Sequence, residues 1–83
     1  SGARLQDANM ERAVLWFAKF TGADLHGANF ANADLSRADF SGADLTGADF
    51  SRADLDGANF VGAIGIGEAK GLDQAVNLDR AQR

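Results

Sequence analysis

Acidic side chains recur at intervals of five and ten residues through the middle of this chain, and they are the first candidates for chemistry. They are Asp24, Asp34, Asp39, Asp44, Asp49 and Asp54. Two carboxylates about 5 Å apart can cleave a glycosidic bond, and carboxylates at alternate positions of a flexible loop can bind Ca²⁺. A spacing of five does not fit a calcium loop. Nothing in the sequence indicates a cleft that would give two neighbouring carboxyl groups different pKa values. We therefore predict no catalytic residue and no metal site, and expect the protein not to be an enzyme.

Two further motifs lack the context that their chemistry needs. His26 is the only histidine, and a zinc site needs three or four ligands, so we expect an ordinary surface side chain. The stretch Gly65-Ile66-Gly67 has the wrong glycine spacing and no surrounding βαβ unit for a dinucleotide site. Cysteine is absent, which excludes a disulfide or a thiolate zinc site. The sequence predicts no cofactor.

The aspartates belong to a five-residue repeat that covers residues 23–62. Each of its eight blocks begins with Ala, continues with Asp or Asn, and has Leu or Phe in third place. These third residues, which we call the centre residues, alternate strictly: Leu25, Phe30, Leu35, Phe40, Leu45, Phe50, Leu55 and Phe60. A period of five fits neither an amphipathic helix nor a pleated strand. It indicates stacked units that bury their apolar residues together.

The pattern A(D/N)LXX, in eight blocks without a break in register, resembles the pentapeptide repeat family. The resemblance implies an all-β fold, a right-handed quadrilateral β-helix with one block on each side and four blocks in each coil. This chain would form about three coils. The centre residues and the alanines two positions before them would point inward as the structural core. The outward Asp and Asn side chains would hydrogen-bond turn amides.

The last residue of each block predicts how the chain turns a corner. It is usually Gly, as at Gly22 and Gly27, and once Asn32, and these residues tolerate φ > 0. Arg37 and Arg52 depart from this habit, so the sides need not all use the same turn.

We interpret residues 1–22 as a degenerate first coil. Ala3, Ala8, Ala13 and Ala18 lie in phase with the later repeat, which places Leu5, Met10, Leu15 and Phe20 at centre positions. The Asp or Asn slot is mostly lost here, so a helical N-terminal cap over residues 10–20 remains an alternative. Residues 1–63 would then form the β-helix.

Residues 64–83 are predicted to cap the open end of the β-helix, because an open end exposes apolar side chains and unpaired backbone. Helix-forming residues at 68–75 favour a short helical turn or two. Residues 76–81 again read as a block, shifted by three from the earlier register. Either a partial extra turn or the end of a helix would explain them.

Composition limits the function classes. The chain has 83 residues and a net charge of −4, which argues against direct binding to nucleic acid or to an anionic membrane surface. It contains no apolar run of membrane-spanning length. No signal peptide is visible, and we expect a bacterial cytoplasmic location if the chain stands alone; because it begins with Ser1, it can equally be a segment of a longer protein.

The leading functional prediction is a non-enzymatic structural or protein–protein interaction module. Val14, Trp16 and Phe17 would point outward from one side of the first coil, and exposed apolar clusters usually mark an interface. As an interface, these residues would bind a partner protein or associate with a second copy through the N-terminal coil. Alternatively, they would pack under an N-terminal cap or a neighbouring chain. The alternative function follows from the family resemblance: some members present an acidic surface that mimics duplex DNA and occupies a type II topoisomerase.

Overall fold

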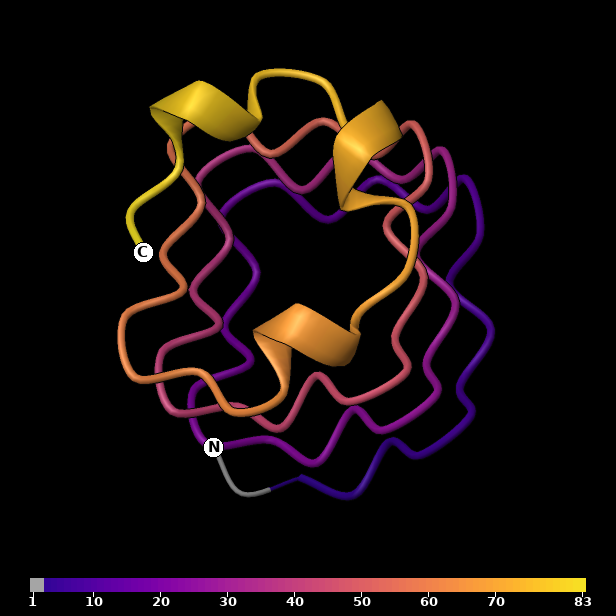
Figure 1. The fold of residues 1–83 in the computed structure, drawn as a ribbon. Coiled ribbons are helices and arrows are strands. Elements are labelled where there is room, and N and C mark those ends of the chain that lie inside the picture. The colour runs from indigo at the N-terminus through magenta and orange to yellow at the C-terminus, as the bar shows by residue number, and fades with distance from the viewer. Residues whose placement is uncertain (1–2) are drawn as a thin grey trace.

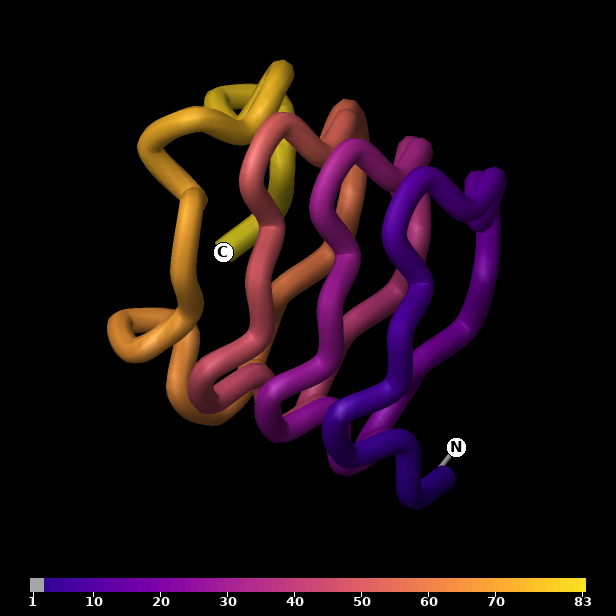
Figure 2. Tube along the Cα trace, turned by 90° about the vertical axis from the view of Figure 1, so that its right-hand side faces the viewer, coloured from indigo at the N-terminus to yellow at the C-terminus, as the bar shows by residue number. Residues whose placement is uncertain are grey.

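The chain winds into a stack of square coils in the computed structural model, which describes residues 3–83. Figure 1 shows the stack along its axis and Figure 2 shows it from the side, with the coils following one another from the N-terminus to the C-terminus. Three coils cover residues 3–22, 23–42 and 43–62, and residues 63–83 make a fourth circuit. Ser1 and Gly2, which belong to the predicted first coil, lie outside the described residues.

Each side of a coil pairs with the next coil through a single-residue parallel bridge. Asp24 bridges Arg4 on one neighbour and Asp44 on the other, so paired residues lie four pentapeptides apart. Leu25 donates its N–H to the Asp44 carbonyl at 2.9 Å, and the Asp44 N–H donates to the Ala23 carbonyl at 2.9 Å. The chain thus pairs as a β-helix does, but no strand longer than one residue forms between residues 3 and 83.

All twelve corners of the three pentapeptide coils use one turn. The N–H of each following alanine donates to the preceding centre carbonyl, as Ala28 does to Leu25 at 2.9 Å. The last residue of every block has φ > 0, and the values run from 58° to 73°. This is the type II geometry that favours glycine. Arg37 and Arg52 adopt it at 59° and 58°, so the expectation that their sides can turn differently is wrong.

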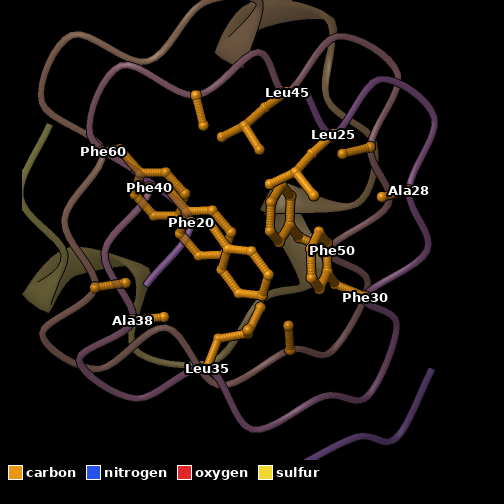
Figure 3. Close-up of a cluster of buried hydrophobic side chains, with 14 of the residues drawn as sticks. Phe20, Leu25, Ala28, Phe30, Leu35, Ala38, Phe40, Leu45, Phe50 and Phe60 are labelled. Carbon is orange, nitrogen blue, oxygen red and sulfur yellow. The ribbon is translucent and has the colours of Figure 1, made fainter. Parts of the chain in front are cut away.

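The centre residues fill the bore of the stack. All eight predicted core residues, from Leu25 to Phe60, are buried, together with the alanines that precede them. Figure 3 shows two facing columns of phenylalanine with leucines between them. Rings within a column stack, as Phe20 and Phe40 do at 5.1 Å and 10°. Rings of opposite columns meet edge to face, as Phe40 and Phe50 do at 5.7 Å and 88°. Both geometries are favourable for aromatic pairs.

Residues 3–22 form a coil and not a helix. The N–H of Met10 donates to the Asn29 carbonyl at 2.7 Å, and that of Phe20 donates to the Asp39 carbonyl at 2.7 Å. The alternative of a helical cap over residues 10–20 is therefore excluded. Leu5, Met10 and Leu15 pack against the core but stay partly exposed at this end.

The fourth circuit is built from six-residue blocks that begin at Ala63, Ala69 and Ala75. Its bridges, Ile64 to Asp44, Lys70 to Asp49, Val76 to Asp54 and Gln82 to Asn59, slip by one residue at each side. Each block contains one 3-10 turn: η1 (Ile66–Glu68), η2 (Leu72–Gln74) and η3 (Leu78–Arg80). Within the stretch 68–75, where a short helical turn or two was predicted, the structure has the 3-10 turn η2 and no longer helix.

The fourth residue of each six-residue block faces the core. Ile66, Leu72 and Leu78 pack against the buried cluster, and Figure 1 shows the three short helices at the near end of the stack. Phe60, the last centre residue, is only 3% exposed under this layer. Among the described residues no helix is long and apolar enough to cross a membrane.

Candidate interaction site

The outward Asp and Asn side chains fold back onto their own turns. In each block the Oδ1 atom accepts the backbone N–H two residues further on, as Asp49 does from Ser51 at 2.9 Å and Asn59 from Val61 at 2.9 Å. Where the fourth residue is Ser or Thr, the hydroxyl can add a second bond to the same oxygen, as in Asp44 with Thr46 at 2.7 Å. The predicted contact between this column and the turn amides is confirmed. The carboxylates therefore stabilise corners.

These bonds also set the ionisation of three carboxylates. The hydroxyl and backbone N–H of Thr46 lower the pKa of Asp44, and those of Ser51 lower the pKa of Asp49. Ser41 lowers the pKa of Asp39 in the same way. Hydrogen bonds to a charged carboxylate favour the charged form. A general acid needs a raised pKa, so these groups are poorly suited to acid catalysis.

The other candidates for chemistry lie apart from one another. Between residues 3 and 83 no three His, Asp or Glu side chains converge as metal ligands, and the surface that these residues form holds no pocket. His26 is exposed. The stretch Gly65-Ile66-Gly67 forms the beginning of η1 instead of a phosphate loop.

An exposed aromatic patch, which we define as Val14, Trp16 and Phe17, lies on one side of the first coil. Their exposed fractions are 69%, 57% and 61%. The two rings meet edge to face with centroids 6.1 Å apart and an interplanar angle of 80°. The structure thus places the three predicted interface residues together and open to solvent. The inward neighbour Leu15 packs against the core and fixes this side of the coil.

Phe17 holds an unusual backbone conformation at the corner that ends this side. Its φ is 64°, a region that bulky side chains rarely adopt. The residue at the same corner of the next coil is Arg37, and its guanidinium carbon lies 5.8 Å from the centre of the Phe17 ring. Sequence reasoning did not include Arg37 in the site, although the spacing of twenty residues between stacked positions could have found it.

A second set of exposed apolar residues lies toward the other end of the stack. Val61 and Ile64 are 53% and 60% exposed near one corner, and Val76 is 49% exposed on another side. Ile64 and Val76 occupy bridge positions that hold Asp in the two coils before them. The sequence interpretation, which treated residues 64–83 as a cap, did not identify them.

The structure is a repeat solenoid, with single-residue bridges between coils, five-residue sides and an interior filled by Leu and Phe. The family model for pentapeptide repeats matches residues 1–37 and 33–64, with 8 copies. This chain therefore belongs to the pentapeptide repeat family. Its similarity to solved pentapeptide repeat proteins implies that its β-helix is right-handed.

Two solved structures are similar to this chain. One is a pentapeptide repeat protein from the thylakoid lumen of Arabidopsis thaliana, with 44% identity over 86% of this chain and 54% of its own, at a TM-score of 0.61. The other is HetL, a pentapeptide repeat protein involved in heterocyst differentiation regulation in the cyanobacterium Nostoc, with 31% identity over 90% of this chain and 41% of its own, at a TM-score of 0.44. This chain spans about half the length of these proteins. No curated protein matches it.

Proposed function

We propose that this chain is a non-enzymatic protein-interaction module that binds a partner through the aromatic patch of Val14, Trp16 and Phe17. The observation that carries the proposal is the pair of exposed aromatic rings, one of which holds a strained backbone conformation. Exposed apolar clusters of this kind mark interaction sites, and aromatic residues dominate the energetics of interfaces.

The other two coils have polar residues or glycine at these positions. The residue that corresponds to Trp16 is Ser36 in the second coil and Asp56 in the third, and the corner of Phe17 is Gly57 in the third coil. A left-handed backbone costs a non-glycine residue about 1–2 kcal/mol. Neither an exposed Trp16 nor a left-handed Phe17 stabilises the fold. We therefore attribute both aromatic residues to a contact with another molecule.

The test compares the proteins retained by immobilised wild type and by a Trp16→Ala/Phe17→Gly double variant, using quantitative mass spectrometry. A Val61→Ala/Ile64→Ala variant is the matched control, because it removes a similar exposed apolar pair at another corner. We expect specific partners to be lost from the patch variant alone. Equal recovery of every protein by the two variants would contradict the proposal.

Self-association through the N-terminal coil is the second form that this proposal takes. Leu5, Met10 and Leu15 remain partly exposed at that end, and burying a Leu-sized side chain is worth about 1.5–3 kcal/mol. In a two-fold dimer the same surface would meet itself. Sedimentation of the 83-residue chain tests it: a monomer at high concentration with an exposed Trp16 fluorescence spectrum would exclude the dimer.

The alternative function is an acidic mimic of duplex DNA that binds a nucleic-acid enzyme such as a type II topoisomerase. The observation in its favour is that stacked aspartates, such as Asp34 above Asp54, point outward in successive coils. It predicts inhibition in a supercoiling assay, reduced by substitutions of these aspartates with Asn and unaffected by loss of Trp16. Either function predicts no binding to duplex DNA at physiological salt, because phosphate contacts need clustered Lys and Arg.

A further inference from the structure

The aromatic patch is bordered by positive charge. Arg12 occupies the corner where its side of the coil begins, Lys19 follows Phe17 onto the next side, and Arg37 lies over the Phe17 ring. All three side chains are exposed. We infer that the partner segment is an acidic peptide with an apolar anchor residue, which lies along the first coil from Arg12 to Lys19. This inference rests on the proposed function and names the chemistry of its partner.

None of these three cations forms an ion pair within 4 Å among residues 3–83. Among the described residues the one ion pair within 4 Å joins Arg80 of the fourth circuit and Asp56 of the third coil, at 3.7 Å. The nearest acidic side chains on the stacked positions, Asp34 and Asp39, each accept a hydrogen bond from their own turn through Oδ1. The nearest competitors for an incoming carboxylate are Asp39, which bridges Lys19 on the next coil, and Glu11, which precedes Arg12.

The charge pattern of the same face fixes the direction of the ligand. Below Val14 the bridge positions hold Asp34 and then Asp54, and Asp56 lies beside them. An acidic segment that ran down the face would approach these carboxylates, whereas one that follows the first coil passes from Arg12 across the apolar side chains to Lys19. Its anchor residue would contact Trp16 and Phe17, and its acidic residues would reach the flanking cations.

The size of the patch favours a short segment over a folded protein surface. Three apolar residues with a cationic border are far fewer than the 20–30 residues on each side that stable interfaces generally use. Single-stranded nucleic acid also binds aromatic and cationic side chains, but a chain of net charge −4, with aspartates in the next coil, repels a continuous phosphate backbone. A peptide can keep its acidic residues near the three cations only.

Trp16 is the only tryptophan, so its fluorescence reports directly on the patch. The probe is a short synthetic peptide without tryptophan, in which glutamates stand on both sides of one phenylalanine. We expect saturable binding that weakens as salt is raised. Three matched peptides carry glutamine for glutamate, lysine for glutamate, or alanine for phenylalanine, and each should bind more weakly than the probe. A short oligothymidylate should not bind.

Variants separate the border from the anchor. Arg37→Gln and Lys19→Gln should each weaken the glutamate peptide about two- to fivefold, the usual range for an exposed pair, and leave the glutamine peptide unchanged. Arg52→Gln is the control, because Arg52 has the same corner conformation as Arg37 but lies in the third coil, two coils from the patch. It should have no effect on peptide binding. Phe17→Gly should weaken every peptide with a phenylalanine.

The outcomes distinguish this inference from the proposed function. If the glutamine peptide binds as tightly as the glutamate peptide, or the lysine peptide binds better, the acidic partner is wrong while the patch remains a binding surface. Tighter binding of the oligothymidylate, or no saturation by the glutamate peptide at about 1 mM, a very weak affinity, also overturns the inference. Peptide binding that Phe17→Gly leaves intact would contradict the patch itself.

Discussion

Phe17 and Arg37 occupy the same corner of successive coils, and the guanidinium carbon of Arg37 lies 5.8 Å from the centre of the Phe17 ring. Both residues hold φ > 0, at 64° and 59°. An exposed cation–π contact is worth about 0.5–1 kcal/mol. Each of the two left-handed residues costs about 1–2 kcal/mol. The contact therefore compensates for only part of the strain at the two corners.

This balance gives the first prediction. Phe17→Gly should raise the free energy of unfolding by no more than about 1 kcal/mol, because relief of the left-handed strain is offset by the lost contacts with Arg37 and with Trp16. Urea denaturation measures the change. Arg52→Gly, at the same kind of corner without an aromatic contact, should raise stability by a similar or larger amount. A clear loss of stability in Phe17→Gly would show that its ring supports the fold.

The second prediction concerns the phenylalanine columns. Phe40 stacks on Phe20 and Phe60 and meets Phe30 and Phe50 edge to face. Phe40→Ala should cost about 3–5 kcal/mol, the range for a fully buried ring. Phe20 is 8% exposed at the end of its column, so Phe20→Ala should cost less. Equal losses in urea denaturation would indicate that the columns do not act as one packed core.

The sequence predicts the regular part of this fold well because each physical requirement recurs every five residues. A small residue at the inner corner, a turn acceptor and a centre residue are all visible in one block, as in Ala43, Asp44 and Leu45. Repetition then supplies the register, and the twenty-residue spacing supplies the stacking. The same logic identified the first coil, although Val14 and Lys19 there replace the turn acceptor.

The six-residue blocks were not predicted, because the five-residue pattern matches residues 76–78 in a register that the structure does not use. Val76-Asn77-Leu78 imitates the second and third positions of a repeat, but the structure uses Ala75 as the first residue and Asn77, at φ 61°, as an inserted left-handed residue. The insertion moves the inward residue from third to fourth place. Alanines at 63, 69, 75 and 81, six residues apart, carry the signal that would have revealed it.

The corners at Arg37 and Arg52 could not be predicted from residue type alone. Glycine marks a turn with φ > 0 because it adopts that conformation without strain, but neighbouring coils impose the same conformation on any residue. The Arg37 N–H donates to the Asp56 carbonyl at 2.7 Å, and the following Ala38 N–H closes the turn onto Leu35 at 3.0 Å. The contact of Arg37 with Phe17 depends on this tertiary constraint.

The third prediction is a dependence of stability on pH. Because the folded pKa of Asp49 lies below its ordinary value of 3.8, the ionised form stabilises the fold above that value, and this contribution is lost as the pH falls toward the lowered pKa. Stability should therefore be nearly constant from neutral pH to about pH 5 and decline below about pH 4. Urea denaturation at a series of pH values measures this profile.

Two variants assign the effect to the corner. Ser51→Ala removes the hydroxyl that donates to Asp49 and should raise the pKa of Asp49 toward its ordinary value, as followed by carboxyl NMR. Asp49→Asn keeps an acceptor for the Ser51 N–H, as Asn29 does for Ala31, and should flatten part of the acid decline. An unchanged Asp49 titration in Ser51→Ala would contradict the assigned cause.

The last prediction tests how the fourth circuit is held to the third coil. Gly71 has φ 75°, and a Cβ atom there would lie 2.6 Å from the Ser51 backbone nitrogen and 2.7 Å from its Cα. Gly71→Ala should therefore push the circuit away from the coil below and cost more than about 1 kcal/mol, because the left-handed strain alone has that size. The Phe50 N–H, which donates to the Lys70 carbonyl at 2.8 Å, should lose protection from hydrogen exchange.

Gly67 provides the matched control within the same segment. A Cβ atom there meets nothing within 4 Å, and its φ is not in the left-handed region. Gly67→Ala should therefore be neutral or stabilise by up to about 1 kcal/mol through the reduced freedom of the unfolded chain. If Gly71→Ala left the Phe50 amide as well protected as Gly67→Ala does, close backbone approach would not be what holds the six-residue blocks in place.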